Sequence, residues 1–320
     1  MNRDLTGGHL RPAIEVRSLR KSFDNATVLD GVDLTVESGS VFALLGPNGA
    51  GKTTIVNILS TLITPDAGNA TVAGADLAEN PDGVRGAIGV TGQFSAVDDL
   101  LNGEENLMLM ADLQHLPRRT GRAKAGELLA RFELTDAAKK IPTTYSGGMR
   151  RKLDLAMTLV GDPKVIFLDE PTTGLDPRSR QTMWDIVRDL AASGVTIFLT
   201  TQYLDEADHL ADRIAVLDHG RIIAEGTPDE LKRQVPGGHV KLTFADAEAL
   251  RRAAADLAAS TVDKEALTLQ VPTDGSVASV RSLLDRLDGV AVDGIAMHTP
   301  DLDDVFFTLT GRQTETQALT

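Results

Sequence analysis

Residues 46–53 combine glycines, a lysine and a threonine at spacings that suit phosphate binding. The stretch matches the P-loop pattern G-x-x-x-x-G-K-[ST] at every fixed position and consists of Gly46, Pro47, Asn48, Gly49, Ala50, Gly51, Lys52 and Thr53. Its glycines let backbone N–H groups turn inward around phosphate oxygens. We expect Lys52 to reach the β- and γ-phosphates of a nucleotide and the Thr53 hydroxyl to bind Mg²⁺. A glycine-rich turn that merely joins a strand to a helix is the alternative.

A second candidate site is the carboxylate pair Asp169 and Glu170, which follows the apolar run at residues 165–168. Asp169 is expected to hold Mg²⁺, directly or through water. Glu170 is then placed to polarise an attacking water as a general base. Taken alone, the pair could equally be a solvated acidic turn at the end of a strand. Together with the phosphate-binding loop, it indicates a site that hydrolyses a nucleotide.

The elements that must position these residues follow from the apolar pattern. Residues 40–45 form a strand-like segment before the loop and residues 54–59 a helical segment after it, the context that the phosphate-binding pattern requires. Residues 165–168 and 195–199 are continuous apolar runs typical of buried parallel strands. The predicted fold class is therefore α/β.

The sequence also predicts how the chain is divided. A nucleotide-binding domain is expected over residues 13–235, with a helical insert at about 96–160. Pro236-Gly237-Gly238 is a plausible boundary, and a small α/β unit is expected over residues 239–310. The ends, residues 1–12 and 311–320, are expected to be disordered.

Composition excludes several classes of function. With 320 residues the chain suggests two domains, and its net charge of −14 argues against a nucleic-acid-binding surface. The absence of cysteine excludes disulfides and thiol chemistry. No run approaches the ~20 apolar residues of a membrane helix, and the start lacks the apolar core of a signal peptide. We therefore expect a soluble chain that needs a partner for any work at a membrane.

The chain resembles ABC-type ATPases in the order of its motifs. Residues 145–149, Tyr-Ser-Gly-Gly-Met, are similar to the family's signature motif, usually written LSGGQ, and precede the Asp-Glu pair. Residues 173–177 resemble its D-loop. Gln93 lies where the family has its Q-loop glutamine, and Phe23 where an aromatic residue stacks on adenine. The resemblance covers about residues 13–235 and implies a RecA-like core with an antiparallel β subdomain and a helical subdomain.

The resemblance implies the cofactors ATP and Mg²⁺ and a role for each matching residue. Glu170 would be the base, with Gln202 and Gln93 also catalytic, while Thr53, Gln93 and Asp169 would complete the Mg²⁺ shell. The residues that would surround ATP are Phe23, Gly46, Pro47, Asn48, Gly49, Ala50, Gly51, Lys52, Thr53, Thr54, Ser146, Gly147, Gly148 and Asp176.

A second nucleotide-binding domain is implied because the chain has one P-loop and one signature. In the family, two such domains sandwich two ATP molecules, and the signature of one domain faces the γ-phosphate of the other. Ser146, Gly147 and Gly148 would therefore act in trans, in a homodimer or with a paralogue. An ordinary helix cap at Ser146 with a loose turn is the alternative.

Three residues depart from the family pattern. Tyr145 replaces the usual Leu and Met149 the usual Gln, both tolerable because the backbone and Ser146 would make the phosphate contacts. Gln202 replaces the switch histidine, which puts in doubt any mechanism that requires a titratable imidazole.

Residues 144–151, 200–203 and 302–307 resemble the daunorubicin/doxorubicin-resistance type of this family. That type implies a separate ABC-2-type integral membrane permease, export of a drug-like or lipid-like compound, and a place at the cytoplasmic face of the cell membrane. The second unit is similar to its accessory domain, for which assembly and passive packing both remain open. An ABC ATPase that acts on the ribosome or DNA is the alternative, disfavoured by the single P-loop and the acidic charge.

The basic run Arg150-Arg151-Lys152 is typical of a solvated helix face. It could instead aid a phosphate site or face anionic lipid.

Overall fold

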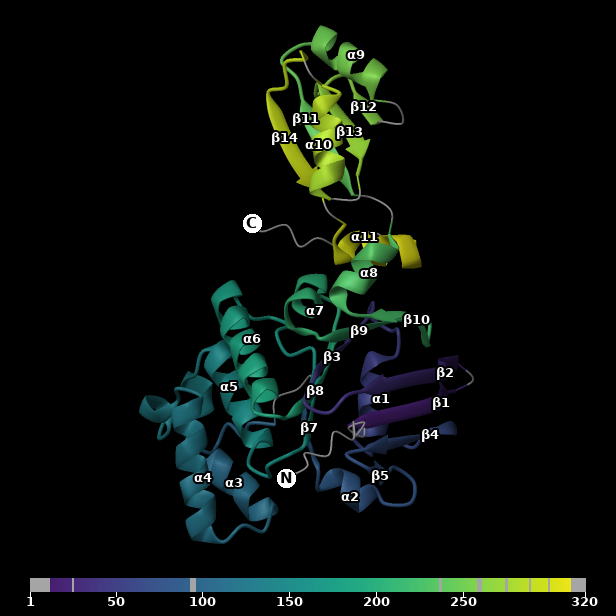
Figure 1. Ribbon diagram of the computed structural model, residues 1–320. Coiled ribbons are helices and arrows are strands. Elements are labelled where there is room, and N and C mark those ends of the chain that lie inside the picture. The colour runs from purple at the N-terminus through teal and green to yellow at the C-terminus, as the bar shows by residue number, and fades with distance from the viewer. Residues whose placement is uncertain are drawn as a thin grey trace, which may run out of the picture. The chain divides into compact units, whose positions relative to one another are not determined.

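The computed structural model describes residues 12–24, 26–92, 96–235, 238–257, 261–273, 276–287, 289–298 and 300–311 (Figure 1). Its contacts divide the chain into two compact units, Met1–Pro228 and Asp229–Thr320. The predicted lead and tail lie almost entirely outside the described residues, and Gln93 lies outside them as well. The domain limits 13–235 and 239–310 remain predictions. Within the described residues, no helix is long and apolar enough to cross a membrane.

A six-stranded sheet forms the centre of the first unit, in the order β10-β9-β3-β8-β7-β6. Its strands from β6 to β9 are parallel, and β10 pairs antiparallel with β9. Every residue of β3, β7 and β8 is buried, as expected for parallel strands covered on both faces. The bounds are β3 Val41–Leu45, β6 Ile88–Thr91, β7 Val165–Asp169, β8 Thr196–Thr201, β9 Arg213–Asp218 and β10 Arg221–Gly226.

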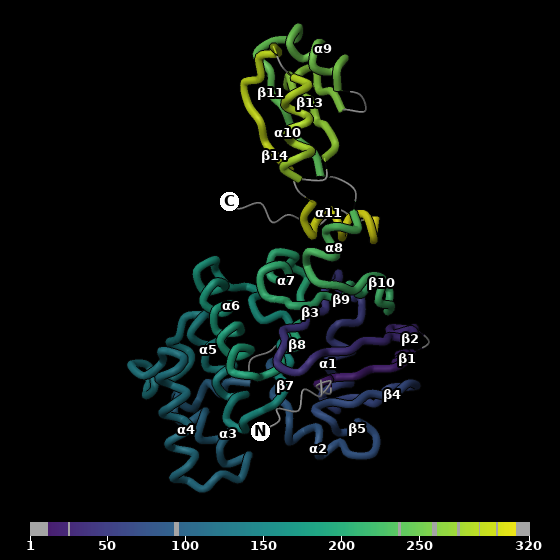
Figure 2. Tube along the Cα trace, viewed as in Figure 1, coloured from purple at the N-terminus to yellow at the C-terminus, as the bar shows by residue number. Residues whose placement is uncertain are grey.

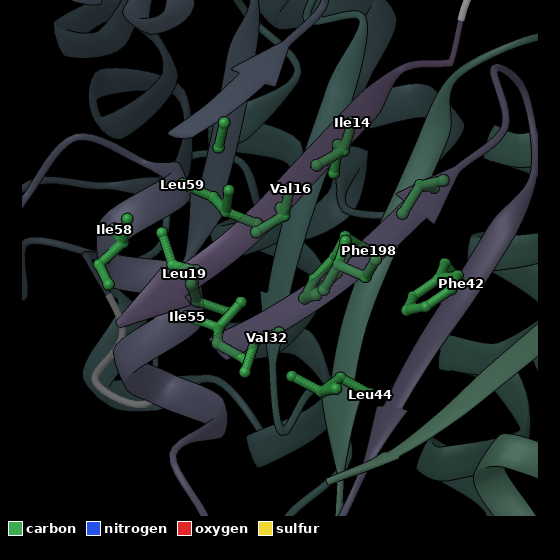
Figure 3. Close-up of a cluster of buried hydrophobic side chains, with 14 of the residues drawn as sticks. Ile14, Val16, Leu19, Val32, Phe42, Leu44, Ile55, Ile58, Leu59 and Phe198 are labelled. Carbon is green, nitrogen blue, oxygen red and sulfur yellow. The ribbon is translucent and has the colours of Figure 1, made fainter. Parts of the chain in front are cut away.

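A four-stranded antiparallel sheet, in the order β2-β1-β4-β5, confirms the predicted β subdomain. Its strands are β1 Ile14–Phe23, β2 Ala26–Val36, β4 Ala67–Val72 and β5 Ala75–Asp76. Helix α1 (Lys52–Leu59) shares a hydrophobic core with both sheets. In Figure 3, Leu59 of α1 lies near Val16 of β1, Ile55 lies near Leu19, and the core extends to Phe198 of β8. Burial of these side chains fixes the helix that carries Lys52 and Thr53.

The predicted helical insert lies between β6 and β7 in the chain. Its first two helices, α3 (Gly103–Leu113) and α4 (Arg118–Arg131), lie side by side in Figure 2. Asn102 caps its first long helix, and its side chain accepts from the Glu105 N–H while Glu105 bonds back to the Asn102 N–H. The second begins at Arg118, earlier than its apolar pattern indicates. The helices of the first unit are α1, α2 Pro81–Arg85, α3 Gly103–Leu113, α4 Arg118–Arg131, α5 Gly147–Thr158, α6 Pro177–Ala192 and α7 Leu204–Leu210, with short 3₁₀ turns at Thr135–Ala137 and Pro142–Thr144.

The second unit has its own antiparallel sheet, in the order β12-β13-β11-β14, and its own apolar core. The sequence does not predict strand β12, because its three residues are too few to show a period and all of them are exposed. The elements are α8 Pro228–Gln234, β11 His239–Thr243, α9 Ala247–Asp256, β12 Thr261–Asp263, β13 Thr268–Pro272, α10 Val277–Asp285, β14 Gly294–His298 and α11 Leu302–Thr310.

Candidate functional site

The register of the central sheet brings the predicted motifs to one edge. Strands β3, β8 and β7 are neighbours and parallel, with Leu45 paired to Thr201 and Asp169 paired to Thr200. Their carboxyl ends therefore meet, which is where open α/β sheets bind ligands. The P-loop follows β3, and Gln202 follows β8. Asp169 is the last residue of β7, and Glu170 comes directly after it. The backbone N–H of Gly46 donates to the Thr201 carbonyl at 3.2 Å, which ties the start of the loop to the end of β8.

Two glycines of the loop cannot carry a side chain. A Cβ at Gly46 would lie 2.3 Å from the Leu217 carbonyl oxygen. Gly51 has a φ of +111° and a built Cβ there would lie 2.8 Å from Leu29 Cδ2. Gly51 is also the N-cap residue of α1, so the loop leads directly into the amino end of a helix. This geometry fits a phosphate-binding loop better than a passive turn.

Lys52 lies inside the loop, with its side chain only 5% exposed. Its Nζ donates to the Gly46 carbonyl at 2.7 Å and to the Pro47 carbonyl at 3.2 Å. The same Nζ lies 3.7 Å from Glu170 Oε1. Burial lowers the pKa of Lys52, while the Glu170 and Asp169 carboxylates act in the opposite direction.

Thr53 and Asp169 form a direct contact across the two motifs. The Thr53 hydroxyl donates to Asp169 Oδ2 at 2.9 Å, and the Thr200 hydroxyl donates to Asp169 Oδ1 at 2.5 Å. The described residues contain no group of three or more acidic, histidine or cysteine side chains that could hold a metal. A hydroxyl and one carboxylate nonetheless fit Mg²⁺, which keeps waters and binds through one or two carboxylates plus substrate phosphates.

Glu170 adopts a left-handed backbone with a φ of 49°, which is costly for a residue with a side chain. Its N–H donates to the carbonyl and the hydroxyl of Thr200, both at 3.1 Å. The Thr173 hydroxyl donates to Glu170 Oε2 at 3.3 Å. These contacts hold the carboxylate beside Lys52, where a phosphate-bound water could be activated.

Ser146 is the N-cap residue of α5, and its Oγ accepts from the Met149 N–H at 3.2 Å. Ser146 and Gly147 are exposed, while a Cβ at Gly148 would lie 2.7 Å from Ser179 Oγ. The Tyr145 hydroxyl donates to the Ala137 carbonyl at 2.7 Å, which gives this departure from the family pattern a local structural role. The capping alternative is thus present, and the role of the signature in trans remains a prediction.

Asp176 lies beside the signature as the N-cap residue of α6. Its carboxylate accepts from the Ser179 N–H at 3.0 Å and from the Ser179 hydroxyl at 2.6 Å. These bonds lower the pKa of Asp176. Its predicted contact with a nucleotide remains a prediction.

Phe23 ends β1 at the tip of the β1–β2 hairpin and is 45% exposed. The same hairpin touches the P-loop, because the Val28 carbonyl would lie 3.1 Å from a Cβ on Gly51. Lys21 Nζ lies 5.4 Å from the centre of the Phe23 ring. An exposed aromatic ring on the hairpin whose other strand touches the loop fits the predicted stacking on adenine, which remains a prediction.

Gln202 directly follows the last residue of β8 and is half-buried.

Sequence reasoning missed two buried groups near the site. Glu206 of α7 is fully buried and accepts at Oε1 from the Thr172 hydroxyl at 2.8 Å and the Trp184 indole at 3.3 Å. Burial raises the pKa of Glu206. The solvated-face prediction is wrong for Arg151, whose side chain is only 13% exposed and donates to the backbone carbonyls of Pro171 and Gly92. The spacing of apolar residues in the sequence does not predict that either side chain is buried, because the partners that cover them come from distant segments.

Comparison with known proteins identifies the family. The ABC transporter family model matches residues 29–173. A daunorubicin resistance ATP-binding protein from Streptomyces coeruleorubidus is 48% identical over 93% of this chain and 96% of its own length. The chain belongs to the ABC transporter family, among ATP-binding proteins of the daunorubicin/doxorubicin-resistance type.

Two further relatives agree with this assignment. The Nod factor export ATP-binding protein I of Ralstonia nicotianae is 39% identical over 94% of this chain and 95% of its own length. The solved structure of an ATP-binding subunit of an ABC transporter is 30% identical, with a TM-score of 0.63 over 69% of this chain and 92% of that chain. This ABC ATPase binds ATP and hydrolyses it to drive export, and a ribosome or DNA target is not favoured.

Proposed function

We propose that this ABC ATPase powers an ABC-2-type permease that exports a drug-like or lipid-like compound. The cluster of Lys52, Glu170, Asp169 and Thr53 carries the proposal. Its proposed phosphate-binding amine lies 3.7 Å from the proposed base, and its two proposed Mg²⁺ ligands are hydrogen-bonded to each other at 2.9 Å. The relative named for daunorubicin resistance supports a drug-like substrate, and the relative named for Nod factor export supports export as the activity. The subunit would then work at the cytoplasmic face of the cell membrane.

In this proposal the residues divide the work at two interfacial ATP sites. Phe23 stacks on adenine, the P-loop from Gly46 to Thr54 binds the phosphates, and Glu170 accepts the proton of the attacking water. Thr53, Asp169 and Gln93 hold Mg²⁺, which supplies charge neutralisation when bound. Gln202 donates a hydrogen bond to the γ-phosphate. The motif Ser146–Gly148, with Asp176, completes the site of a second copy, because a chain with one P-loop and one signature cannot close a site alone.

The test is transport by the full chain together with a candidate ABC-2-type permease in a drug-sensitive host. Cells with both proteins should accumulate less of an anthracycline-type drug than cells with the permease and Glu170→Gln. Drug accumulation that is equal in both strains, with ATP hydrolysis intact in the parent protein, would contradict drug export. The same strains loaded with a labelled lipid then decide the second substrate class.

A further inference from the structure

Arg151, in the second turn of α5, reaches three backbone oxygens of two separate segments. Its Nε donates to the Pro171 carbonyl at 3.0 Å and its Nη1 to the Gly92 carbonyl at 3.2 Å. A longer contact of 3.5 Å joins Nη2 to the Asp169 carbonyl. The contacts to Asp169 and Pro171 lie on either side of Glu170 in the chain. One side chain therefore ties α5 to the backbone around the proposed base.

Asp154 completes the arrangement one turn further along α5. Its Oδ2 accepts from Arg151 Nη1 at 3.2 Å, and its Oδ1 accepts from the Ala96 N–H at 3.0 Å. The Asp154 side chain is only 2% exposed. The pair thus holds the backbone at Gly92 and at Ala96.

Stability alone does not explain why the chain has an ion pair at this largely buried position. Removing two charges from water costs several kcal/mol per ion, and packed apolar residues of similar volume often stabilise a fold at least as well. Burial lowers the pKa of Arg151 and raises the pKa of Asp154, each against the attraction of the other. A guanidinium does offer something that apolar groups lack, because its rigid fork of five donors can bind several carbonyls at once.

We propose that Arg151 and Asp154 are positioning residues of the ATP site, which hold Gly92, Ala96 and the backbone around Glu170 in register with α5. The inference rests on the roles proposed above for Glu170 and Asp169. Because Ser146 caps helix α5, the pair links the signature to the catalytic edge of the same chain. Displacement of that edge misplaces the Mg²⁺ ligand Asp169 and the base Glu170, while the P-loop before α1 still binds nucleotide.

The test uses the full chain and three variants. Arg151→Lys keeps the charge and can pair with Asp154, but one ammonium cannot reproduce the fork of contacts. Asp154→Asn keeps an acceptor for Ala96 and removes the charge. The double variant Arg151→Met with Asp154→Leu replaces the pair by apolar side chains and avoids an unpaired buried charge. Lys152→Met is the matched control, because Lys152 lies next to Arg151 on α5 and its ammonium pairs instead with Glu133, at 2.9 Å.

Two quantities distinguish positioning from a structural role. One is the affinity for a fluorescent ATP analogue with and without Mg²⁺, and the other is kcat for ATP hydrolysis. Each test variant should lose most of the affinity gained from Mg²⁺ and about 10–100-fold in kcat, near the cost of a 1 Å misplacement. Affinity without Mg²⁺ should stay within about twofold of the parent, as for a P-loop left intact. Lys152→Met should match the parent in both measurements.

Two results would overturn the inference. The first is that Arg151→Lys and the double variant both keep the parent's kcat and the parent's increase in nucleotide affinity on addition of Mg²⁺. Alternatively, all test variants could lose Mg²⁺-free affinity and thermal stability together, as expected for a purely structural pair. A parent protein that neither binds nor hydrolyses ATP would contradict the proposed function itself, which is a different outcome from an active parent with unchanged variants.

Discussion

The Nζ of Lys52 lies 3.7 Å from Oε1 of Glu170, although the two residues come from different strand–loop segments of the chain. The contact joins the predicted phosphate-binding amine directly to the predicted base. Because the Lys52 side chain is 5% exposed and that of Glu170 is 9% exposed, the two charges compensate each other in a poorly hydrated place. A nucleotide phosphate would compete with Glu170 for Lys52 and release the carboxylate toward water.

Glu170→Gln should leave ATP binding nearly intact and lower kcat by about 10²–10⁴, the usual contribution of general acid–base catalysis. It should also favour the ATP-closed dimer, because a complex that cannot hydrolyse ATP does not reopen. Single-turnover hydrolysis and size-exclusion chromatography with ATP measure the two effects. Glu133→Gln, which alters only an exposed partner of Lys152, is the control. Hydrolysis at the parent rate would exclude Glu170 as the base.

Phe23→Ala should weaken ATP binding by roughly ten- to a hundredfold. Stacking of a base on an aromatic ring is worth about 1–3 kcal/mol, and 1.4 kcal/mol corresponds to a factor of ten. GTP should lose affinity similarly, because the ring offers no hydrogen bonds that distinguish purines. Equilibrium titration with both nucleotides measures this, and Phe23→Trp should restore binding. Equal affinity in the alanine variant and the parent would remove Phe23 from the site.

Gln202→Ala should lower turnover by about 10²–10³, the usual cost of deleting one preorganised donor. Gln202→His should keep much of the activity, because an imidazole can donate the same hydrogen bond. The His variant should also gain an ionisation between about pH 5 and 8 that the parent lacks, since a glutamine amide does not titrate. Single-turnover rates of the three proteins across this range measure both effects. Hydrolysis by Gln202→Ala at the parent rate would show that residue 202 takes no part in turnover.

Glu206→Gln should change the pH dependence of stability. Burial raises the pKa of Glu206, so the folded protein keeps this proton to a higher pH than the unfolded chain does. The contribution of Glu206 to the free energy of unfolding is complete below its pKa in the unfolded chain, about 4.3. Above that pH the contribution falls by up to about 1.4 kcal/mol per pH unit, until the pH reaches the pKa of Glu206 in the folded protein. Glutamine can keep the bonds from Thr172 and Trp184 without titrating.

The stability of Glu206→Gln relative to the parent should therefore increase as the pH is raised from about 5 to 8. Urea denaturation followed by the fluorescence of Trp184, the only tryptophan, measures this free energy of unfolding. Glu79→Gln, at an exposed position, should follow the parent at every pH. A constant difference between Glu206→Gln and the parent would mean that Glu206 is ionised in the folded protein.

The sequence by itself determined the local parts of this protein. The P-loop, the apolar strand that ends at Asp169, and most helices depend on neighbouring residues, so glycine spacing and apolar periodicity predict them. The α/β class with its antiparallel subdomain and helical insert was confirmed. The order of the motifs sufficed to identify the family, because several short patterns in a fixed order are far more specific than any one of them.

Only the tertiary structure decided how distant residues pair. The contact of Thr53 with Asp169 depends on the sheet order β3-β8-β7, which no local pattern encodes. Arg151 shows the same limit, because a basic run is typical of a solvated face and only the approach of Gly92 and Pro171 makes it a buried donor. Glu206 likewise becomes a buried acid through Thr172 and Trp184. Long-range packing sets the dielectric environment of these groups, and therefore their chemistry.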